Sequence, residues 1–414
     1  MEATPDGIRE EFRAWVTEQW DPQLSLAEWR HRLVSSGWAA PSWHPRWHGR
    51  GLPAWADAIV ASELARADAV GNPLGVGAWL AAPTILDHGP DTLRERFLEP
   101  ILTGEETWCQ LFSEPGAGSD LAGVTTQAVL DGDRWIVNGQ KLWTTSAHHA
   151  DFGILVARTN WDVPKHRGLS YFVLPMRQPG VEVRSLRQMN FHRSFNEVFL
   201  TDAETPREYV VGAVGDGWKV ALTTLAYERR FAGAGMERTA LLGDGPARSQ
   251  ARSEIADYLQ TYRWYPQRAG RADLAVEHAR REGRSGDPIV RQEIARLTAM
   301  VRVSEWTAAR ARAARTLGRP PGAEGSIGKL ASSRIARQAS AVHSLIGGAN
   351  GLLSGPTAPF DGMIAEVLVS TPAQSIAGGT DEIQHNILGE RVLDLPREPN
   401  AHDDIAFRDV PRNR

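Results

Sequence analysis

FSEPGAGSDLAG, residues 112–123, is the stretch that decides how this chain is interpreted, and GQKLWTTSA, residues 139–147, follows it across a hairpin. Gly116 and Gly118 allow backbone N–H groups to approach an anion closely. Ser119 adds a hydroxyl that can donate to a phosphate oxygen. Taken alone, such a turn could be a plain polar loop. The paired spacing of the two stretches favours a binding loop instead.

The predicted secondary structure changes on both sides of these stretches, from helical patterns to β-type patterns and back. Thr4 followed by Pro5 is typical of a helix N-cap and first helical residue. Helical patterns continue at 54–67 and 91–103, and they return from 216 to about 392, including 288–313 and 326–345. Between them lie short β-type runs punctuated by turn residues. These runs are Thr107–Ser113, Val124–Leu130, Arg134–Val137, Phe152–Arg158, Leu169–Pro175, Val181–Arg184 and Glu197–Leu200.

This order predicts an α+β fold with three parts. We expect an N-terminal helical domain over residues 1–105 and a middle, mostly antiparallel β domain over 106–215. A C-terminal helical domain follows over 216–396, and a loosely ordered tail over 397–414, where Pro and charged residues dominate.

A third stretch, AGGTDEIQHNILGERVLDLPRE at 377–398, completes a pattern with the first two. Together they resemble the signature elements of the acyl-CoA dehydrogenase family of flavoproteins, and the resemblance extends from about Pro41 to Glu398. It implies FAD as cofactor and the three-part fold predicted above. It also implies dehydrogenation between the α and β carbons of an acyl thioester, with the hydride passing to the flavin.

The resemblance assigns roles to residues near the flavin. Ser119 and the backbone at Gly118 would bind the diphosphate, and Thr380 and Glu382 would contact the nucleotide half of FAD. The residues expected along the flavin ring are Gln110, Phe112 and Ser113, with Trp143 and Thr145 reaching it from the next loop.

An arginine of a neighbouring subunit neutralises the diphosphate in this family. Arg281 is the best match here, although the Phe-Gly that often follows is missing. Arg280 or Arg284 could serve instead, and Arg281 could also be a solvated charge at a helix end. If the correspondence holds, FAD lies across a subunit interface and the protein is a homo-oligomer, a dimer or a tetramer.

The catalytic base is displaced relative to many family members, because Gly378 stands where they carry a glutamate. A branch that includes isovaleryl-type and long-chain enzymes places the glutamate on an earlier helix, here GWKVALTTLAYERRFAGAG at 217–235. Glu228 is the matching residue, and Arg229 matches a position near the substrate. Asp381 and Glu382 are close to the lost position, but the family pattern directs them to the cofactor.

Helix geometry also points to Glu228. Ala221, Leu225, Glu228 and Ala232 fall on one helix face, which is otherwise apolar. A carboxylate on such a face costs free energy unless it is paired or functional, and burial would raise its pKa toward the value a general base needs. The alternative is a structural ion pair with Arg229 or another arginine.

Composition and charge limit the other possibilities. The chain has 414 residues, 42% hydrophobic and 23% charged, with a net charge of −4, so neither nucleic acid nor an anionic membrane is an expected partner. We expect no membrane-spanning segment and no secretion signal. Cys109 is the only cysteine, which excludes an intrachain disulfide and fits a cytoplasmic location. His44 and His48 have no partners that suggest a metal site, and none is predicted.

The leading hypothesis is therefore an FAD-dependent acyl-CoA dehydrogenase that passes electrons to an electron-transfer flavoprotein. The acyl group could be carried on CoA or on another thioester. Two alternatives stay open: a flavin-dependent N-hydroxylase or oxidase of the same fold, and a non-catalytic partner subunit of a mixed dehydrogenase. The length and branching of the acyl group are not readable from the sequence.

Overall fold

The computed structural model describes residues 4–231, 243–316, 322, 324–399, 402 and 404–411. Its contacts divide the chain into two compact units. The first contains Met1–Leu186, Arg193–Thr261 and Asn400–Arg414, and the second contains Arg187–His192 and Tyr262–Pro399. This division into two units does not test the predicted domain boundaries at 105, 215 and 396, which stay predictions.

The N-terminal part of the first unit is helical, as expected from its sequence. Thr4 caps the first helix by accepting a hydrogen bond from the Gly7 amide at 3.2 Å, and Pro5 opens it. Phe12 and Val16 are buried against the neighbouring helices. The helices are α1 Pro5–Gln19, α2 Leu26–Ser35, α3 Ala56–Arg66, α4 Ala82–His88 and α5 Asp91–Thr103.

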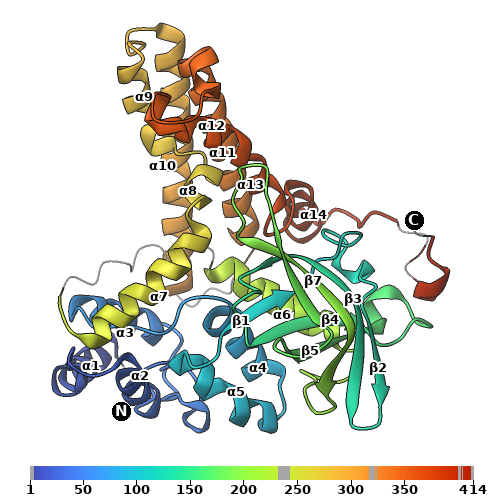
Figure 1. Ribbon diagram of the computed structural model, residues 1–414. Helices are drawn as coiled ribbons and strands as arrows, with labels where there is room; N and C mark the ends of the chain where they lie inside the picture. The colour runs from blue at the N-terminus through green and yellow to red at the C-terminus, as the bar shows by residue number, and fades with distance from the viewer. Residues whose placement is uncertain are drawn as a thin grey trace. The chain divides into compact units, whose positions relative to one another are not determined.

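The middle part is a seven-stranded sheet, visible in Figure 1. Its strands are β1 Trp108–Leu111, β2 Gln127–Asp131, β3 Arg134–Thr145, β4 Phe152–Arg158, β5 Leu169–Pro175, β6 Val181–Leu186 and β7 Phe195–Pro206. The order is β1-β4-β2-β3-β7-β6, with β5 paired to β4. Pairing is mostly antiparallel; β1 and β2 run parallel to β4. The predicted α+β class and the mostly antiparallel middle sheet are confirmed.

β3 is longer than the sequence indicates. It runs to Thr145, so Trp143 and Thr145 lie at the end of a strand and not in a following loop. The pairing of β3 with β7 shifts register between Val137 and Gly139 and again between Lys141 and Thr144. Such irregularities interrupt the alternation of apolar and polar residues by which a strand is recognised.

Two further helices belong to the first unit. α6 Gly217–Phe231 packs on β5 and α4, where Thr224 is fully buried. α7 Pro246–Tyr262 is tied to α2 by an ion pair between Arg30 and Glu254 at 2.8 Å. These contacts fix α6 against the same sheet that carries the loop 112–123.

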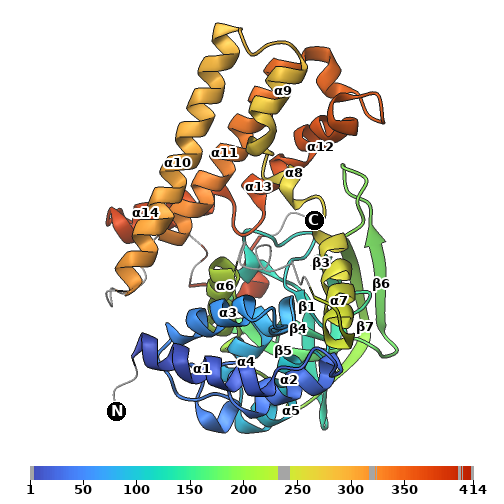
Figure 2. The same cartoon turned by 90° about the vertical axis from the view of Figure 1, so that its left-hand side faces the viewer.

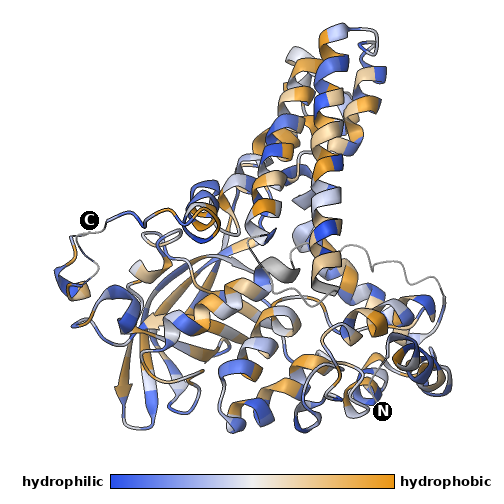
Figure 3. Cartoon of the chain, turned by 180° about the vertical axis from the view of Figure 1, so that it is seen from behind, coloured by the Kyte–Doolittle hydropathy of each residue, from blue (hydrophilic) through white to orange (hydrophobic). Residues whose placement is uncertain are grey.

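The second unit is a helical bundle built around α10 Pro288–Thr316 and α11 Glu324–Gly347, which lie side by side in Figure 2. Val290, Leu297, Val342 and Ile346 form its core. The shorter helices are α8 Tyr265–Arg268, α9 Ala275–Arg281, α12 Met363–Ser370, α13 Pro372–Ile376 and α14 Asp381–Val392. In Figure 3, polar and apolar residues alternate along the long helices. Within the described residues, none of the helices is long and apolar enough to cross a bilayer.

The C-terminal tail departs from expectation. Residues Phe407–Asp409 form a short 3₁₀ helix, and the Phe407 side chain is only 3% exposed. The expectation of a loosely ordered tail is therefore wrong for this segment. One aromatic residue among polar neighbours gives a short tail enough apolar surface to dock.

Candidate active site

Glu114 fixes the start of the loop 112–123. Its carboxylate is 6% exposed and accepts hydrogen bonds from the amides of Thr125 at 2.7 Å and Thr126 at 2.9 Å. It also forms an ion pair with Lys141 at 2.8 Å. Burial by itself raises the pKa of Glu114, but the Lys141 ammonium and the hydrogen bonds outweigh it, so the pKa lies below its usual value. The loop thus begins at a buried charged anchor.

Lys141 joins the two motif stretches. Its side chain is fully buried, and Nζ also donates to the carbonyl oxygens of Phe112 at 3.0 Å and Val156 at 2.8 Å. The amide of Leu142 donates to the carbonyl of Ser113 at 2.8 Å. The stretches 112–123 and 139–147 therefore lie side by side at this point.

Gly116 and Gly118 form the open part of the loop. A Cβ added at either would meet no atom of the described chain within 4 Å, and neither residue has a positive φ. Internal packing and backbone conformation therefore give no reason for glycine here. Ser119 beside them is exposed. Open backbone amides followed by a free-standing hydroxyl fit the close approach of a diphosphate, so these residues suit FAD.

The end of the loop is held by charged side chains as well. Asp120 pairs with Lys165 at 2.8 Å. Arg158, fully buried at the end of β4, donates to the carbonyl oxygens of Ala122 at 2.7 Å and Val124 at 3.1 Å. The glycine and serine residues thus lie between two anchored ends.

Trp143 is placed by a strand irregularity. It lies where β3 shifts register against β7, has a φ of 61° and is 53% exposed. Its ring meets Phe195 edge-on, with ring centroids 5.7 Å apart. A bulky residue in the left-handed region costs about 1–2 kcal/mol. Strain and exposure of this kind are frequent at ligand-binding positions. Thr145, two residues on, is half-buried and pairs with Phe195 in the ladder.

The residues expected along the flavin ring surround the end of β1. Gln110 is half-buried on β1, Phe112 is 5% exposed directly after it, and Ser113 is half-buried. Phe112 packs edge-on against Tyr171 of β5, with ring centroids 5.8 Å apart. The structure places all three on one short segment beside Lys141 and Leu142.

Tyr171 connects this segment to α6. Its hydroxyl lies 2.9 Å from the Thr224 hydroxyl, which in turn lies 3.0 Å from the hydroxyl of Thr84 on α4. All three side chains are fully buried. Burial raises the pKa of the Tyr171 phenol, so the group stays protonated and can donate. This network fixes the turn of α6 that precedes Glu228.

Glu228 lies one helical turn after Thr224. Ala221 on the same face is fully buried and Leu225 packs against the core, but Glu228 itself is half-buried. The expected apolar face is therefore present up to Leu225 and opens at Glu228. Ala232 and the side chain of Arg229 lie outside the described residues.

The second unit holds the third motif in a tight turn. Gly378 and Gly379 have φ values of 68° and 83°. Thr380 caps α14, because its hydroxyl accepts from the Ile383 amide at 3.3 Å. The Gln384 side chain, fully buried, donates to the Gly378 carbonyl at 3.3 Å. Left-handed glycines and a helix cap thus build this turn.

The acidic residues after Thr380 differ in environment. Asp381 is 5% exposed and pairs with Lys329 at 3.2 Å and Arg337 at 3.1 Å. Glu382 is exposed. Asp381 therefore has a structural task, whereas Glu382 is open to a ligand.

Arg281 ends α9 on the surface of the second unit. Its side chain is 56% exposed, pairs with Glu277 at 2.8 Å and covers the Phe360 ring at 4.3 Å. Arg284 instead pairs with Asp287 and donates to the carbonyl of Leu345. Arg281 is thus the more accessible of the two.

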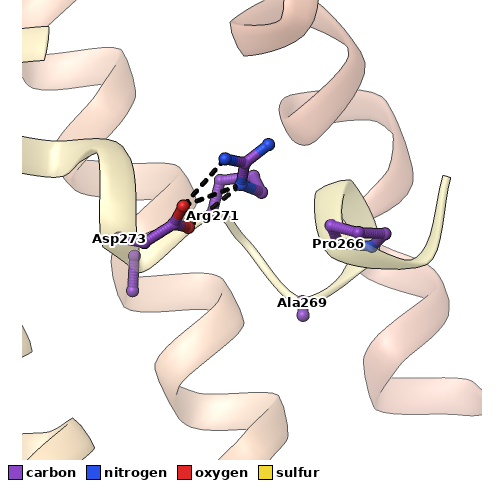
Figure 4. Close-up of a pocket in the computed structure, with 5 residues that line it drawn as sticks. Pro266, Ala269, Arg271 and Asp273 are labelled. Carbon is purple, nitrogen blue, oxygen red and sulfur yellow. Dashed lines mark hydrogen bonds and ion pairs between the residues drawn. The ribbon is translucent and has the colours of Figure 1, made fainter. Parts of the chain in front are cut away.

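A shallow cavity of about 470 Å³ lies elsewhere in the second unit. Pro266, Ala269, Arg271, Ala272 and Asp273 line it. Figure 4 shows Arg271 turned toward Asp273, and the two form an ion pair at 2.7 Å. The cavity contains none of the predicted site residues. Among the described residues, no group of three His, Cys, Asp or Glu side chains could hold a metal ion.

Sequence reasoning missed the residues that support the site. Glu114 lies just after β1 and Lys141 lies on β3, inside the two quoted stretches, and an acid and a base that are both buried usually pair. Tyr171 lies in an apolar strand, where its hydroxyl needs a buried partner. Neither signal identifies the partner, because Lys141 follows Glu114 by 27 positions and Thr224 follows Tyr171 by 53.

Comparisons with known proteins agree with this architecture. The family models for the N-terminal, middle and C-terminal domains of acyl-CoA dehydrogenases match residues 4–105, 109–203 and 267–393. Acyl-CoA dehydrogenase IpdE1 of Mycobacterium tuberculosis is 36% identical over 376 residues, which cover 89% of this chain and 88% of IpdE1.

Two further matches add detail. Acyl-CoA dehydrogenase FadE34 of Mycobacterium tuberculosis is 36% identical over 94% of this chain, but the chain spans only 49% of FadE34. The crystal structure of the ChsE4-ChsE5 complex from Mycobacterium tuberculosis matches with a TM-score of 0.65 and 27% identity, covering 96% of this chain and 100% of that one. Since all three domain models match in order, the chain belongs to the acyl-CoA dehydrogenase family, a family of flavoprotein oxidoreductases that act on CH–CH donors.

Proposed function

We propose that this chain removes the α-proton and β-hydride of an acyl-CoA, or of another acyl thioester, to give a trans-2-enoyl thioester. Glu228 is the proposed base, and FAD is the proposed cofactor. FAD, when bound, supplies the acceptor for the hydride at N5. Every other part of the reaction falls to side chains of this chain, which bind, orient and deprotonate the substrate.

The observation that carries the proposal is the chain of contacts from the loop 112–123 to α6. Phe112 packs on Tyr171, and Tyr171 bonds to Thr224, so one buried tyrosine contacts both the segment proposed to line the flavin and the helix with the proposed base. From Thr224 to Glu228 the helix rises by about 6 Å. This arrangement supports a carboxylate held at a fixed distance from the ring-edge residues.

Glu228 has the properties that the proposed step needs. It is half-buried, so it is accessible to a substrate and partly shielded from water. A carboxylate can accept the proton next to the thioester carbonyl, whose acidity depends on polarisation of that carbonyl. Ala221 and Leu225 pack the preceding part of this face into the core, so they fix the helix just before Glu228.

The test is replacement of Glu228 by Gln in the full chain. We expect the variant to fold and bind FAD as the wild type does, but substrate should no longer bleach the flavin absorption. Loss of a general base lowers kcat by about 10²–10⁴-fold. Stopped-flow absorbance at the flavin band measures this rate.

Glu182→Gln is the matched control, because Glu182 is an exposed glutamate on β6 paired with Arg184. It should keep the wild-type rate. Full bleaching in Glu228→Gln would contradict the assignment of the base, whereas wild-type protein without a flavin band would contradict the cofactor.

The remaining assignments follow the same proposal. Gly118 and Ser119 bind the diphosphate, Thr380 and Glu382 contact the nucleotide half, and Arg281 acts from a neighbouring subunit of a homo-oligomer. Arg229 lies near the substrate. Gln110, Phe112, Ser113, Trp143 and Thr145 line the flavin. An electron-transfer flavoprotein takes the electrons, and the location is the cytoplasm. A panel of straight, branched and ring-bearing thioesters, scored by flavin bleaching, would identify the acyl group.

A second candidate is a partner subunit within a mixed dehydrogenase. Two observations favour it: the similar ChsE4-ChsE5 structure is a complex, and this chain spans about half of FadE34. Purification of the chain alone distinguishes the candidates. A stable yellow protein that turns over thioesters supports the leading proposal, and a colourless, inactive one supports the partner subunit.

A further inference from the structure

The C-terminal segment docks on the middle β domain within the first unit. The amide of Phe407 donates to the Val163 carbonyl at 2.9 Å, and the amide of Arg408 donates to the Trp161 carbonyl at 3.1 Å. Arg408 also forms an ion pair with Asp162. Two backbone hydrogen bonds and an ion pair thus fix the position of the buried Phe407 ring.

Phe407 covers the guanidinium of Arg158. The guanidinium carbon lies 3.5 Å from the centroid of the Phe407 ring, and Arg158 is fully buried. Trp161 adds a second ring, whose centroid is 5.5 Å from that of Phe407. An arginine under an aromatic face gains cation–π attraction and is shielded from water.

Arg158 in turn holds the backbone that follows Gly118 and Ser119. It donates to the carbonyls of Ala122, Val124 and Lys165, the last at 3.1 Å. Lys165 pairs with Asp120, the residue after Ser119. The planar fork of one arginine therefore fixes both the end of the loop 112–123 and the segment that binds Asp120.

We propose that Phe407 is a positioning residue for the diphosphate-binding loop. The C-terminal segment acts as a clip, defined here as residues 404–411, that shields Arg158 and so keeps the backbone at 118–124 in its binding conformation. The inference rests on the proposed binding of FAD. It assigns a role in cofactor affinity to a segment that lies far from the loop in the sequence.

The physical reason is competition with water. Hydrogen bonds from a buried guanidinium to carbonyls are strong because water is excluded. Removing the ring would admit water to Arg158, and the carbonyls of Ala122 and Val124 would exchange a rigid donor for a mobile one. The loop would then populate other conformations, and FAD affinity falls in proportion to the fraction of competent loop.

The experiment compares Phe407→Ala and Phe407→Leu with the wild type in the full chain. FAD dissociation constants are measured by quenching of flavin fluorescence. We expect Phe407→Ala to weaken FAD binding about tenfold, a factor between those of an exposed and a desolvated cation–π contact. Phe407→Leu, which keeps apolar cover without the ring, should lie between the two.

A matched destabilised control separates positioning from stability. Val16→Ala removes buried volume among the N-terminal helices, where Val16 is 4% exposed. It should lower the melting temperature but leave the dissociation constant of FAD unchanged. Hydrogen–deuterium exchange provides a readout without cofactor: peptides covering 118–126 should exchange faster in Phe407→Ala and not in Val16→Ala.

The outcomes are distinct. Unchanged FAD affinity and unchanged exchange in Phe407→Ala would overturn the clip while leaving the proposed function in place. Equal weakening by Val16→Ala would also overturn it, because affinity would then follow global stability. Wild-type protein that binds no FAD would overturn the proposed function, and the proposed effect on affinity with it.

Discussion

The loop 112–123 and the turn 377–384 both carry motif residues, but the two regions use them differently. In the loop, side chains outside the glycine-serine segment do the structural work, through Glu114, Lys141 and Arg158. Gly116 and Gly118 are left without an internal task. In the turn, the motif residues themselves build the structure.

Several motif residues of the turn 377–384 have structural roles of their own. Thr380 caps α14, Asp381 pairs with Lys329, and the glycines supply left-handed backbone. Of the acidic residues there, Glu382 is the exposed one. The comparison teaches that a motif match has two meanings. It can mark residues kept for a ligand, or residues kept for a local conformation.

The largest effect is expected from breaking the charged anchor of the loop, the ion pair between Glu114 and Lys141. Lys141→Met leaves the Glu114 carboxylate buried without its ammonium, and breaking a buried pair in this way costs about 3–5 kcal/mol. The double variant Glu114→Gln, Lys141→Met should recover part of this loss, because it removes the buried charge, although the single carbonyl oxygen of Gln can accept from only one of the Thr125 and Thr126 amides. Urea denaturation gives both free energies of unfolding.

Arg184→Met serves as the control for Lys141→Met. Arg184 and Glu182 form an exposed pair on β6, with side chains 58% and 59% exposed. Such pairs contribute about 0–1 kcal/mol. A Lys141→Met variant no less stable than Arg184→Met would show that the loop does not depend on buried charge.

The second unit contains a buried pair that is neutral, in contrast to the charged pair that anchors the loop. Nδ1 of His278 lies 3.0 Å from Nδ1 of His343, and both side chains are fully buried. His343 Nε2 contacts the Arg271 carbonyl at 3.1 Å and must donate to it, so its Nδ1 accepts from His278. Burial, and then the nearby His343, lowers the pKa of His278 to about 4. Burial also lowers the pKa of His343.

The sign of the pH effect follows from these directions. An unfolded histidine binds a proton below about pH 6.5, whereas folded His278 does so only below about 4. Stability is therefore fully present above about pH 6.5 and falls as the pH drops toward 4, by about 2–3 kcal/mol. The charged groups around the histidine pair are Arg271, Asp273, Glu282 and Arg281, and the Arg281 guanidinium lies over the Phe360 ring.

The measurement is the melting temperature between pH 7 and 4.5. His278→Gln should show a smaller loss than the wild type over this range. His31→Gln, at an exposed histidine beside Glu105, should behave as the wild type does. Identical curves for His278→Gln and wild type would mean that the imidazole pair does not control acid stability.

Much of the fold could be predicted because its signals are local. The strands at 152–158 and 169–175 are continuous apolar runs between turn residues, and the structure has them at the same residues. Thr4 and Pro5 likewise form a local signal, which predicted the start of α1. Phe407 was missed because a single aromatic residue in a polar tail gives no local sign of the surface it meets.

The candidate site could be proposed from the sequence as a set of residue types but not as an arrangement. Helical spacing places Glu228 on one face of its helix, yet its partial exposure depends on how α6 packs, which no periodicity reveals. Likewise, the roles of Tyr171 and Arg158 depend on contacts across the sheet. Long-range pairing of this kind is set by tertiary packing and not by residue order.

The smallest expected effect tests the turn 377–384 by its backbone. Gly378 has a φ of 68°, and a Cβ there would meet no described atom within 4 Å, so substitution strains the backbone without a clash. Gly378→Glu should therefore lower the free energy of unfolding by about 1–2 kcal/mol. Gly378→Asn should cost less, because asparagine tolerates this region of φ and ψ.

Gly286→Glu is the control for Gly378→Glu. Gly286 is exposed, equally uncrowded and without a positive φ, so its replacement should be close to neutral. Equal costs at 378 and 286, measured by urea denaturation of the apoprotein, would mean that the conformation of the turn does not require glycine at 378.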